Sequence, residues 1–175
     1  MFKNLKADIK RYIKGPNDKR NIYVIFEQGL WAVIIYRFGR WVRGIRIPII
    51  SLLLKMIAFL LFKMAEIITG VSLPASAEIG KGFYAGHFGC IILHSDVKIG
   101  ENCSIVSGVL IGTLGLGNTG VPVIGNNVYI GAGAKILGGI RIGSNVKIGA
   151  NAVVITDVPD NVTAVGIPAK IINKE

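Results

Sequence analysis

The chain beyond Gly70 carries aliphatic residues at every sixth position. The longest run keeps one register over Ile124, Ile130, Ile136, Ile142, Ile148 and Val154. A second apolar series follows four positions after each of these, at Val128, Ala134, Ile140, Val146, Ala152 and Val158. Shorter runs of the same period pass through Leu73, Ile79, Ala85 and Ile91, and through Ile99, Ile105 and Ile111. This period indicates an internal structural repeat.

A six-residue repeat of this kind predicts short strands joined by tight corners. Side chains alternate between the two faces of a strand, and the chain's 23 glycines suit corners that turn the chain sharply. Three strands close one triangular coil, and stacked coils bury a column of Ile, Val and Ala that no single repeat could bury alone. We expect a parallel β-helix of roughly five coils between Leu73 and Val158. Insertions are expected around His94-Ser95 and from about Thr113 to Val123.

Residues 1–70 follow a different pattern and predict a short α-helical N-terminal region, with the β-helix in residues 71–175. The stretch from Ile49 to Ile68 is strongly apolar, but Lys55 and Lys63 interrupt it, so it lacks a charge-free span of about twenty residues. The polar residues near one stripe of its helical wheel are Ser51, Lys55, Lys63 and Glu66. This favours a helix largely buried in protein, or lying in a membrane interface, over a transmembrane helix.

Basic charge is concentrated in the same N-terminal region. Residues 1–70 hold 13 Lys and Arg against 4 Asp and Glu, whereas residues 71–175 hold 7 against 6. Aromatic residues alternate with arginines between Trp31 and Arg46, which suits an anionic membrane surface. The alternative is that these helices pack on one another or across subunits. We expect no nucleic-acid partner, because the sequence contains no recognition module.

The cysteines and the N-terminus bear on the compartment. Cys90 and Cys103 lack CxxC spacing and paired histidines, so we expect no metal site and two small, buried thiols. The first twenty residues are charged throughout and contain no early apolar stretch, so no cleavable signal peptide is expected. We therefore expect a cytoplasmic protein, peripheral at the inner face of the cell membrane if its N-terminal region binds lipid.

Three segments resemble the hexapeptide-repeat acyltransferases, within them the serine acetyltransferase-like branch that includes polysaccharide-modifying acetyltransferases. The segments are IGKGFYAGHFGCIIL, VYIGAGAKILGGIRIGSNVKIGANAVV and DVPDNVTAVGIPAKII, and the resemblance covers about residues 70–172. It implies a left-handed parallel β-helix that forms homotrimers, with acetyl-CoA as co-substrate in the groove between neighbouring subunits. Whether two trimers join through their N-terminal helices stays open.

The resemblance also implies a catalytic role for His87, in AGHFG, where the family carries its catalytic histidine. A base with a pKa near neutrality can remove the proton of an acceptor hydroxyl as it attacks the thioester. The alternative is a structural histidine at a corner. For His94, at the short insertion, surface or substrate-groove contact is expected instead of catalysis.

The same matching implies a set of cofactor-binding residues. Thr113 and Leu114 begin the loop beside the pantetheine arm, and Lys147 lies towards the nucleotide end. Small residues that let a thin cofactor arm approach the backbone are Ala132 and Ala150. The segment expected to close over the nucleotide end is Pro168, Ala169 and Lys170. Coil packing and solvated charge are the alternatives for these residues.

The sequence departs from the serine acetyltransferases at positions that matter for their acceptor. Their first coil carries an aspartate that supports the catalytic histidine, where this chain has Ser72. A histidine and an adjacent arginine of their long loop hold the amino acid, where this chain has Gly120 and Val121 within NTGVPVIG. These departures and the short N-terminal region favour a different acceptor.

We therefore expect an O-acetyltransferase that modifies a sugar or glycolipid in cell-envelope polysaccharide biosynthesis, with His87 as general base. The first alternative is serine O-acetylation in cysteine biosynthesis, and the second is a non-catalytic β-helix scaffold. A carbonic-anhydrase-like site would need three histidines on one metal, and the chain has only His87 and His94.

Overall fold

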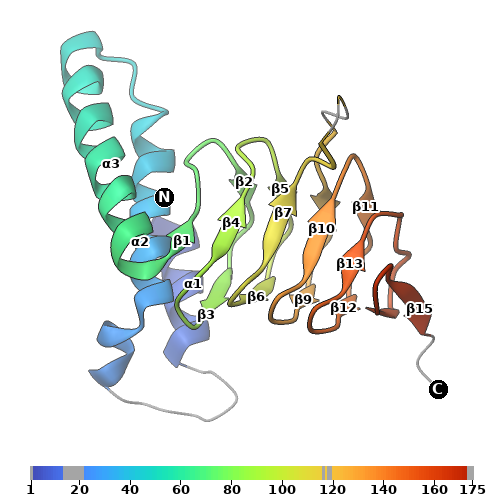
Figure 1. Cartoon of the computed structure of the whole chain (residues 1–175). Helices are drawn as coiled ribbons and strands as arrows, with labels where there is room; N and C mark the ends of the chain where they lie inside the picture. Colours follow the sequence, from blue (N-terminus) through green and yellow to red (C-terminus); the bar gives the residue numbers. More distant parts are fainter. Residues whose placement is uncertain (1, 14–21, 116, 118–119, 173–175) are drawn as a thin grey trace.

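The computed structural model describes residues 2–13, 22–115, 117 and 120–172. The N-terminal region contains α1 (Phe2–Ile13), a short 3-10 helix (Ile22–Phe26), α2 (Gln28–Val42) and α3 (Pro48–Thr69). These helices lie at one end of a stack of triangular coils, and β15 lies at the other end (Figure 1). The mainly β architecture with a helical N-terminal region agrees with the prediction.

The described residues form fifteen short strands in three sheets, one on each side of the coil stack. The first sheet contains β1 (Val71–Ser72), β4 (Ile91–Leu93), β7 (Leu110–Gly112), β10 (Lys135–Leu137) and β13 (Val153–Val154). The second contains β2 (Glu78–Ile79), β5 (Lys98–Ile99), β8 (Val123–Ile124) and β11 (Arg141–Ile142). The third contains β3 (Tyr84–Gly86), β6 (Ser104–Val106), β9 (Tyr129–Ile130), β12 (Lys147–Ile148), β14 (Thr163–Val165) and the antiparallel β15 (Lys170–Ile172).

The strand register explains the six-residue period. In the second sheet Ile79 pairs with Ile99, which pairs with Ile124, so that identical side chains stack in a column inside the coils. The third sheet stacks Ala85, Ile105, Ile130, Ile148 and Ala164 in the same way. All these side chains are buried. Burying each isoleucine contributes about 1.5–3 kcal/mol, so the predicted hydrophobic columns form the core.

Two tyrosines of the helical region cover the open edge of the first coil. β2 and β3 end their sheets, so their outer backbone groups face no further strand. The Tyr36 hydroxyl donates to the Ala77 carbonyl at 2.8 Å and accepts from the Ile79 amide at 3.1 Å. The Tyr12 hydroxyl does the same at Ala85, at 3.0 Å in both directions. Burial raises the pKa of both phenols, which therefore stay protonated donors.

A buried ion pair completes this cap. The Arg37 Nε lies 2.7 Å from the Asp8 carboxylate, and both side chains are almost fully buried. Asp8 accepts from the Phe83 amide at 2.8 Å. Arg37 donates to the carbonyls of Ile79 at 2.7 Å and Gly80 at 2.6 Å. The four side chains, which we call the coil cap (Asp8, Tyr12, Tyr36 and Arg37), replace the missing neighbouring strand and block edge-to-edge pairing.

Two alternatives were expected for this stretch, and α3 does not match the first of them, a helix largely buried in protein; the second, a helix in a membrane interface, stays a prediction. Its first turn carries Pro48, and it ends at Gly70, whose left-handed backbone (φ 66°) is typical of a helix C-cap. The residues of α3 that are buried are the small or polar Ser51, Ala65 and Thr69. Most large apolar side chains of α3 are exposed.

Candidate active site

One edge of the coil stack gathers most of the predicted site residues. This edge, which we call the site edge, joins the third sheet to the first at residues 87–90, 107–109, 131–134 and 149–152. It also includes residues 166–169, which connect β14 to β15 and are hydrogen-bonded to Val153 of the first sheet. Its corners are linked from coil to coil by backbone hydrogen bonds, such as Gly133 N to Ser107 O and Asn151 N to Ala132 O, both 2.8 Å. Strands of neighbouring coils lie about 4.8 Å apart. His87 and Ala150, three coils apart, are therefore separated by about 14 Å along the edge.

His87 begins the first corner of this edge, directly after β3, and its side chain is exposed. Its backbone is left-handed, with φ 65°. Among the described non-glycine residues, the other left-handed positions are Cys90, at the same corner, and the asparagines 102, 127, 145, 151 and 161. Asparagine tolerates this conformation, whereas histidine adopts it less readily and at a cost in strain. A strained residue at an exposed corner is typical of a functional site.

The chemistry available at His87 is that of a base open to solvent. Imidazole is the side chain whose ordinary pKa lies nearest neutrality, so it can accept a hydroxyl proton and return it within one reaction. Within the described part of the chain, no side chain is hydrogen-bonded to His87. The predicted role of His87 is thus compatible with its position, and it stays a prediction.

A carboxylate lies next to Ser72, where the family's aspartate was expected. The Ser72 hydroxyl donates to Glu66 Oε1 at 2.6 Å, and Lys63 Nζ lies 2.7 Å from Glu66 Oε2. Partial burial raises the pKa of Glu66, but the hydrogen bonds from Lys63 and Ser72, together with the Lys63 charge, hold that pKa below its usual range. The sequence did not reveal this contact, because Glu66 lies in the last turn of α3 and Ser72 lies in β1 of the first coil.

His94 lies on a different edge, where the first sheet meets the second. Its Nδ1 accepts from the Asp96 amide at 3.2 Å and lies 3.8 Å from the Asp96 carboxylate. Asp96 therefore lies at the His94 corner, on a different edge from His87, and it forms no hydrogen bond with His87 among the described residues. Cys90 is exposed, which contradicts the expectation of two buried thiols, because it turns a corner outward; Cys103 is buried as expected.

The predicted cofactor residues divide between two edges. Ala132, Ala150 and Ala169 lie on the site edge with Pro168, and Ala169 donates its amide to the Val153 carbonyl at 2.8 Å. The exposed lysines beside this edge are Lys147 on β12 and Lys170 on β15. The remaining two, Thr113 and Leu114, follow β7 and start the loop on the His94 edge.

The long loop is described only in part. Leu114 is exposed, and Val121 packs against the hydrophobic core. Asn118 and Thr119 of the NTGVPVIG segment lie outside the described residues. In the parts of the chain that are described, no group of three or more His, Cys, Asp or Glu side chains is placed to hold a metal ion.

Comparison with known proteins identifies the family. Residues 122–156 match the family described as Bacterial transferase hexapeptide (six repeats). The chain is 34% identical to a serine acetyltransferase of Helicobacter pylori over 98% of both chains. It is 36% identical to a serine acetyltransferase of Synechococcus elongatus, covering 98% of this chain and 69% of the relative. The chain belongs to the serine acetyltransferase family.

Solved structures agree with this assignment. The serine acetyltransferase of Brucella abortus in complex with coenzyme A is 31% identical, with a TM-score of 0.86 over 99% of this chain and 68% of that one. The Neisseria gonorrhoeae serine acetyltransferase in complex with serine is 34% identical, with a TM-score of 0.81 over 98% of this chain and 68% of that one. The left-handed β-helix, the O-acetyltransferase activity and acetyl-CoA as co-substrate are therefore confirmed.

The expectation of a sugar or glycolipid acceptor in polysaccharide biosynthesis is wrong. It depended on the short N-terminal region and on Ser72, Gly120 and Val121. The Helicobacter pylori relative matches this chain over 98% of both lengths, so a compact helical region is compatible with a serine acetyltransferase. The substitutions at those three positions do not remove the chain from the family, and the alternative that we gave first, serine O-acetylation, is the better supported one.

Proposed function

We propose that this enzyme is a serine O-acetyltransferase, which transfers the acetyl group of acetyl-CoA to the hydroxyl of L-serine. The observation that carries the proposal is the 34% identity to the Helicobacter pylori serine acetyltransferase across almost the whole of both chains. The Glu66 carboxylate supports it further, because Glu66 is hydrogen-bonded to Ser72, where the family resemblance places a carboxylate.

The proposed reaction uses His87 as its general base. The imidazole removes the serine hydroxyl proton while the hydroxyl oxygen attacks the thioester carbonyl carbon. A backbone N–H stabilises the oxyanion that forms. The carbon–sulfur bond then breaks, and the leaving thiolate takes the proton from the imidazolium. The products are O-acetylserine and coenzyme A, and His87 returns to its neutral form.

We also propose that the site is shared between subunits of a homotrimer. Thr113 and Leu114 lie across the first sheet from His87, and strands of three residues there separate the two edges by about 10 Å. One chain therefore does not bring its own Leu114 against its own site edge. In a closed three-fold ring, the His94 edge of one subunit faces the site edge of its neighbour.

The test is to measure coenzyme A release from acetyl-CoA with L-serine, and with L-alanine as the matched acceptor that lacks only the hydroxyl. We expect release that depends on L-serine and is absent with L-alanine. Binding of acetyl-CoA by calorimetry, in the same preparation, shows that the protein is intact. Acetyl-CoA binding without serine-dependent release would contradict the serine assignment.

A further inference from the structure

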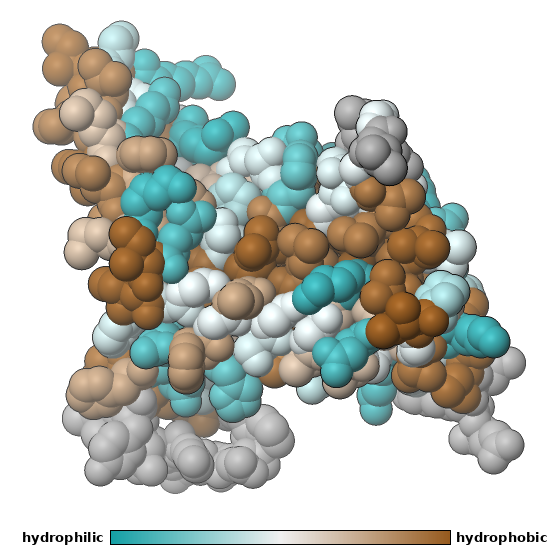
Figure 2. Space-filling model, viewed as in Figure 1, coloured by the Kyte–Doolittle hydropathy of each residue, from teal (hydrophilic) through white to brown (hydrophobic). Residues whose placement is uncertain are grey.

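Helix α3 presents a continuous apolar surface to solvent. The residues of this surface, which we call the outward face, are Ile49, Leu53, Met56, Leu60, Met64 and Ile67. They recur at intervals of three and four positions and so lie on one side of the helix. Each is between 54% and 84% exposed. Figure 2 shows apolar residues along α3 at the left of the molecule, bordered by hydrophilic residues.

The side of α3 that faces the protein has the opposite character. Ser51, Ala65 and Thr69 are buried there, and α3 packs on α2 through this side. A helix in water normally turns its large apolar residues inward and its small or polar ones outward. Helices that face lipid commonly show the reverse pattern, with small and hydroxyl residues in the helix contact. The pattern of α3 therefore indicates an apolar environment outside the helix.

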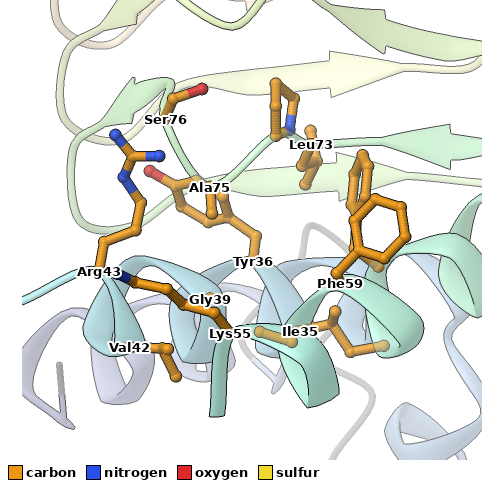
Figure 3. Close-up of a pocket in the computed structure, with 13 residues that line it drawn as sticks. Ile35, Tyr36, Gly39, Val42, Arg43, Lys55, Phe59, Leu73, Ala75 and Ser76 are labelled. Carbon is orange, nitrogen blue, oxygen red and sulfur yellow. The ribbon is translucent and has the colours of Figure 1, made fainter. Parts of the chain in front are cut away.

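Basic residues lie on the side of α3 that faces α2. A pocket of about 210 Å³ between α2, α3 and the first coil is lined by Arg43 and Lys55 together with apolar residues, among them Ile35, Phe59 and Phe62 (Figure 3). Neither Arg43 nor Lys55 forms an ion pair with any described residue. Two cations beside an apolar wall suit a phosphate headgroup that carries an acyl chain.

From these observations we propose that α3 binds the surface of an anionic lipid bilayer, with the outward face in the acyl region and the cations of α2 and α3 at the headgroups. The charge of residues 1–70, 13 basic against 4 acidic, complements the anionic lipid of the cytoplasmic leaflet. A second copy of the chain is the competing occupant, and the sedimentation measurement below distinguishes it from lipid.

The helix lies in the plane of the membrane and does not cross it. Among the described residues, Pro48–Thr69 is the one helix long and apolar enough to span a bilayer. However, α3 packs on α2, and α2 is fixed to the first coil by the hydrogen bonds of Tyr36 and Arg37 to backbone carbonyls. A spanning α3 would draw these buried polar groups into lipid, whereas an in-plane α3 leaves the coils in water.

Vesicle flotation of the full-length enzyme tests this proposal. We compare vesicles of phosphatidylcholine alone with vesicles that contain about one third phosphatidylglycerol, at about 0.05 M and about 0.5 M salt. We expect at least about tenfold more protein to float with the anionic vesicles at low salt, and less at high salt. The double variant Leu53→Glu/Leu60→Glu should lose flotation. Arg43→Gln/Lys55→Gln should lose the preference for anionic lipid.

Ile172→Glu is the matched control, because Ile172 is an exposed apolar residue at the far end of the coils and should float like the wild type. Equal flotation of the wild type and Leu53→Glu/Leu60→Glu, or no flotation of the wild type, would overturn the proposal. A second result would also overturn it: the wild type does not bind vesicles but sediments at twice the mass of the Leu53→Glu/Leu60→Glu variant. The outward face would then bind a second copy of the assembly. Serine acetylation is measured without vesicles, so failure of the lipid proposal leaves the proposed function untouched.

Discussion

His87 has a left-handed backbone that the described coils elsewhere have at asparagines and glycines, and at Cys90. Five corners of the described coils have asparagine with φ between 56° and 63°. Two of these asparagines donate side-chain hydrogen bonds to the asparagine of the next coil, as in Asn127 to Asn145 at 3.0 Å. Asparagine at a corner therefore has a structural role, whereas His87 gains no such contact within the described residues. The histidine is better explained by chemistry than by stability.

The first prediction follows from this comparison. His87→Asn keeps a residue that accepts the left-handed backbone but removes the base. We expect turnover to fall by about two to four orders of magnitude, with acetyl-CoA affinity changed by less than about twofold. Steady-state release of coenzyme A and calorimetric titration measure the two quantities.

Two further variants bound this interpretation. His87→Ala should lose turnover to the same extent, and Ser72→Ala should lose less, because Ser72 can act only by positioning another group. Turnover of His87→Asn near the wild-type level would show that His87 is structural. A Ser72→Ala loss as large as that of His87→Asn would make the Glu66–Ser72 pair essential to catalysis.

At the scale of elements, the N-terminal helices cover the first coil and also satisfy the hydrogen bonds of its outer backbone groups. The first coil has a neighbouring coil on one side and none on the other. On that open side, side chains of the coil cap form hydrogen bonds with the backbone N–H and C=O groups of the coil. Asp8 and Arg37 neutralise each other there, both buried. A buried charge that loses its partner is costly, whereas an exposed pair contributes little.

The second prediction compares these two situations. Asp8→Asn leaves the buried Arg37 without a counter-charge, so we expect the free energy of unfolding to fall by about 3–5 kcal/mol. Glu101→Gln breaks the exposed Lys81–Glu101 pair, 3.2 Å long, and should cost less than about 1 kcal/mol. Urea unfolding at one fixed protein concentration measures both. Equal destabilisation by the two variants would mean that the cap does not hold the first coil.

The sequence predicted the elements unevenly, for physical reasons. The column through Ile99, Ile124 and Ile142 was predictable, because each strand buries the same position of every repeat. The Asp8–Arg37 pair was not, since its residues are 29 positions apart in helices whose packing no local pattern specifies. Cys90 was misassigned because a corner, unlike a strand, has no alternation that indicates which side is buried.

At the scale of the whole molecule, the proposed trimer would complete the candidate site with residues from two chains. The sequence matching placed His87 and Leu114 in one cofactor groove, and the structure places them on different edges of the coils. Sequence reasoning could name both groups of residues but could not separate them, because the assignment of corners to edges depends on the insertions near His94 and after Thr113. The separation agrees with a groove between neighbouring subunits, which the family resemblance implies.

The last prediction tests that sharing directly. His87→Asn removes the base from the site edge, and Leu114→Asp places a negative charge, at an exposed residue, where the phosphate-bearing cofactor is expected. Each variant alone should show little activity at low acetyl-CoA.

When equal amounts of the two are unfolded and refolded together, about a quarter of the contacts in a randomly assembled ring join an intact His87 to an intact Leu114. We therefore expect the mixture to recover about a quarter of wild-type activity, whereas each variant refolded by itself keeps its own low activity. If each chain contains a complete site, every site in the mixture carries one of the two lesions. Activity at the level of the separate variants would then refute the shared site, provided that sedimentation shows the mixture and the separately refolded variants assembled alike.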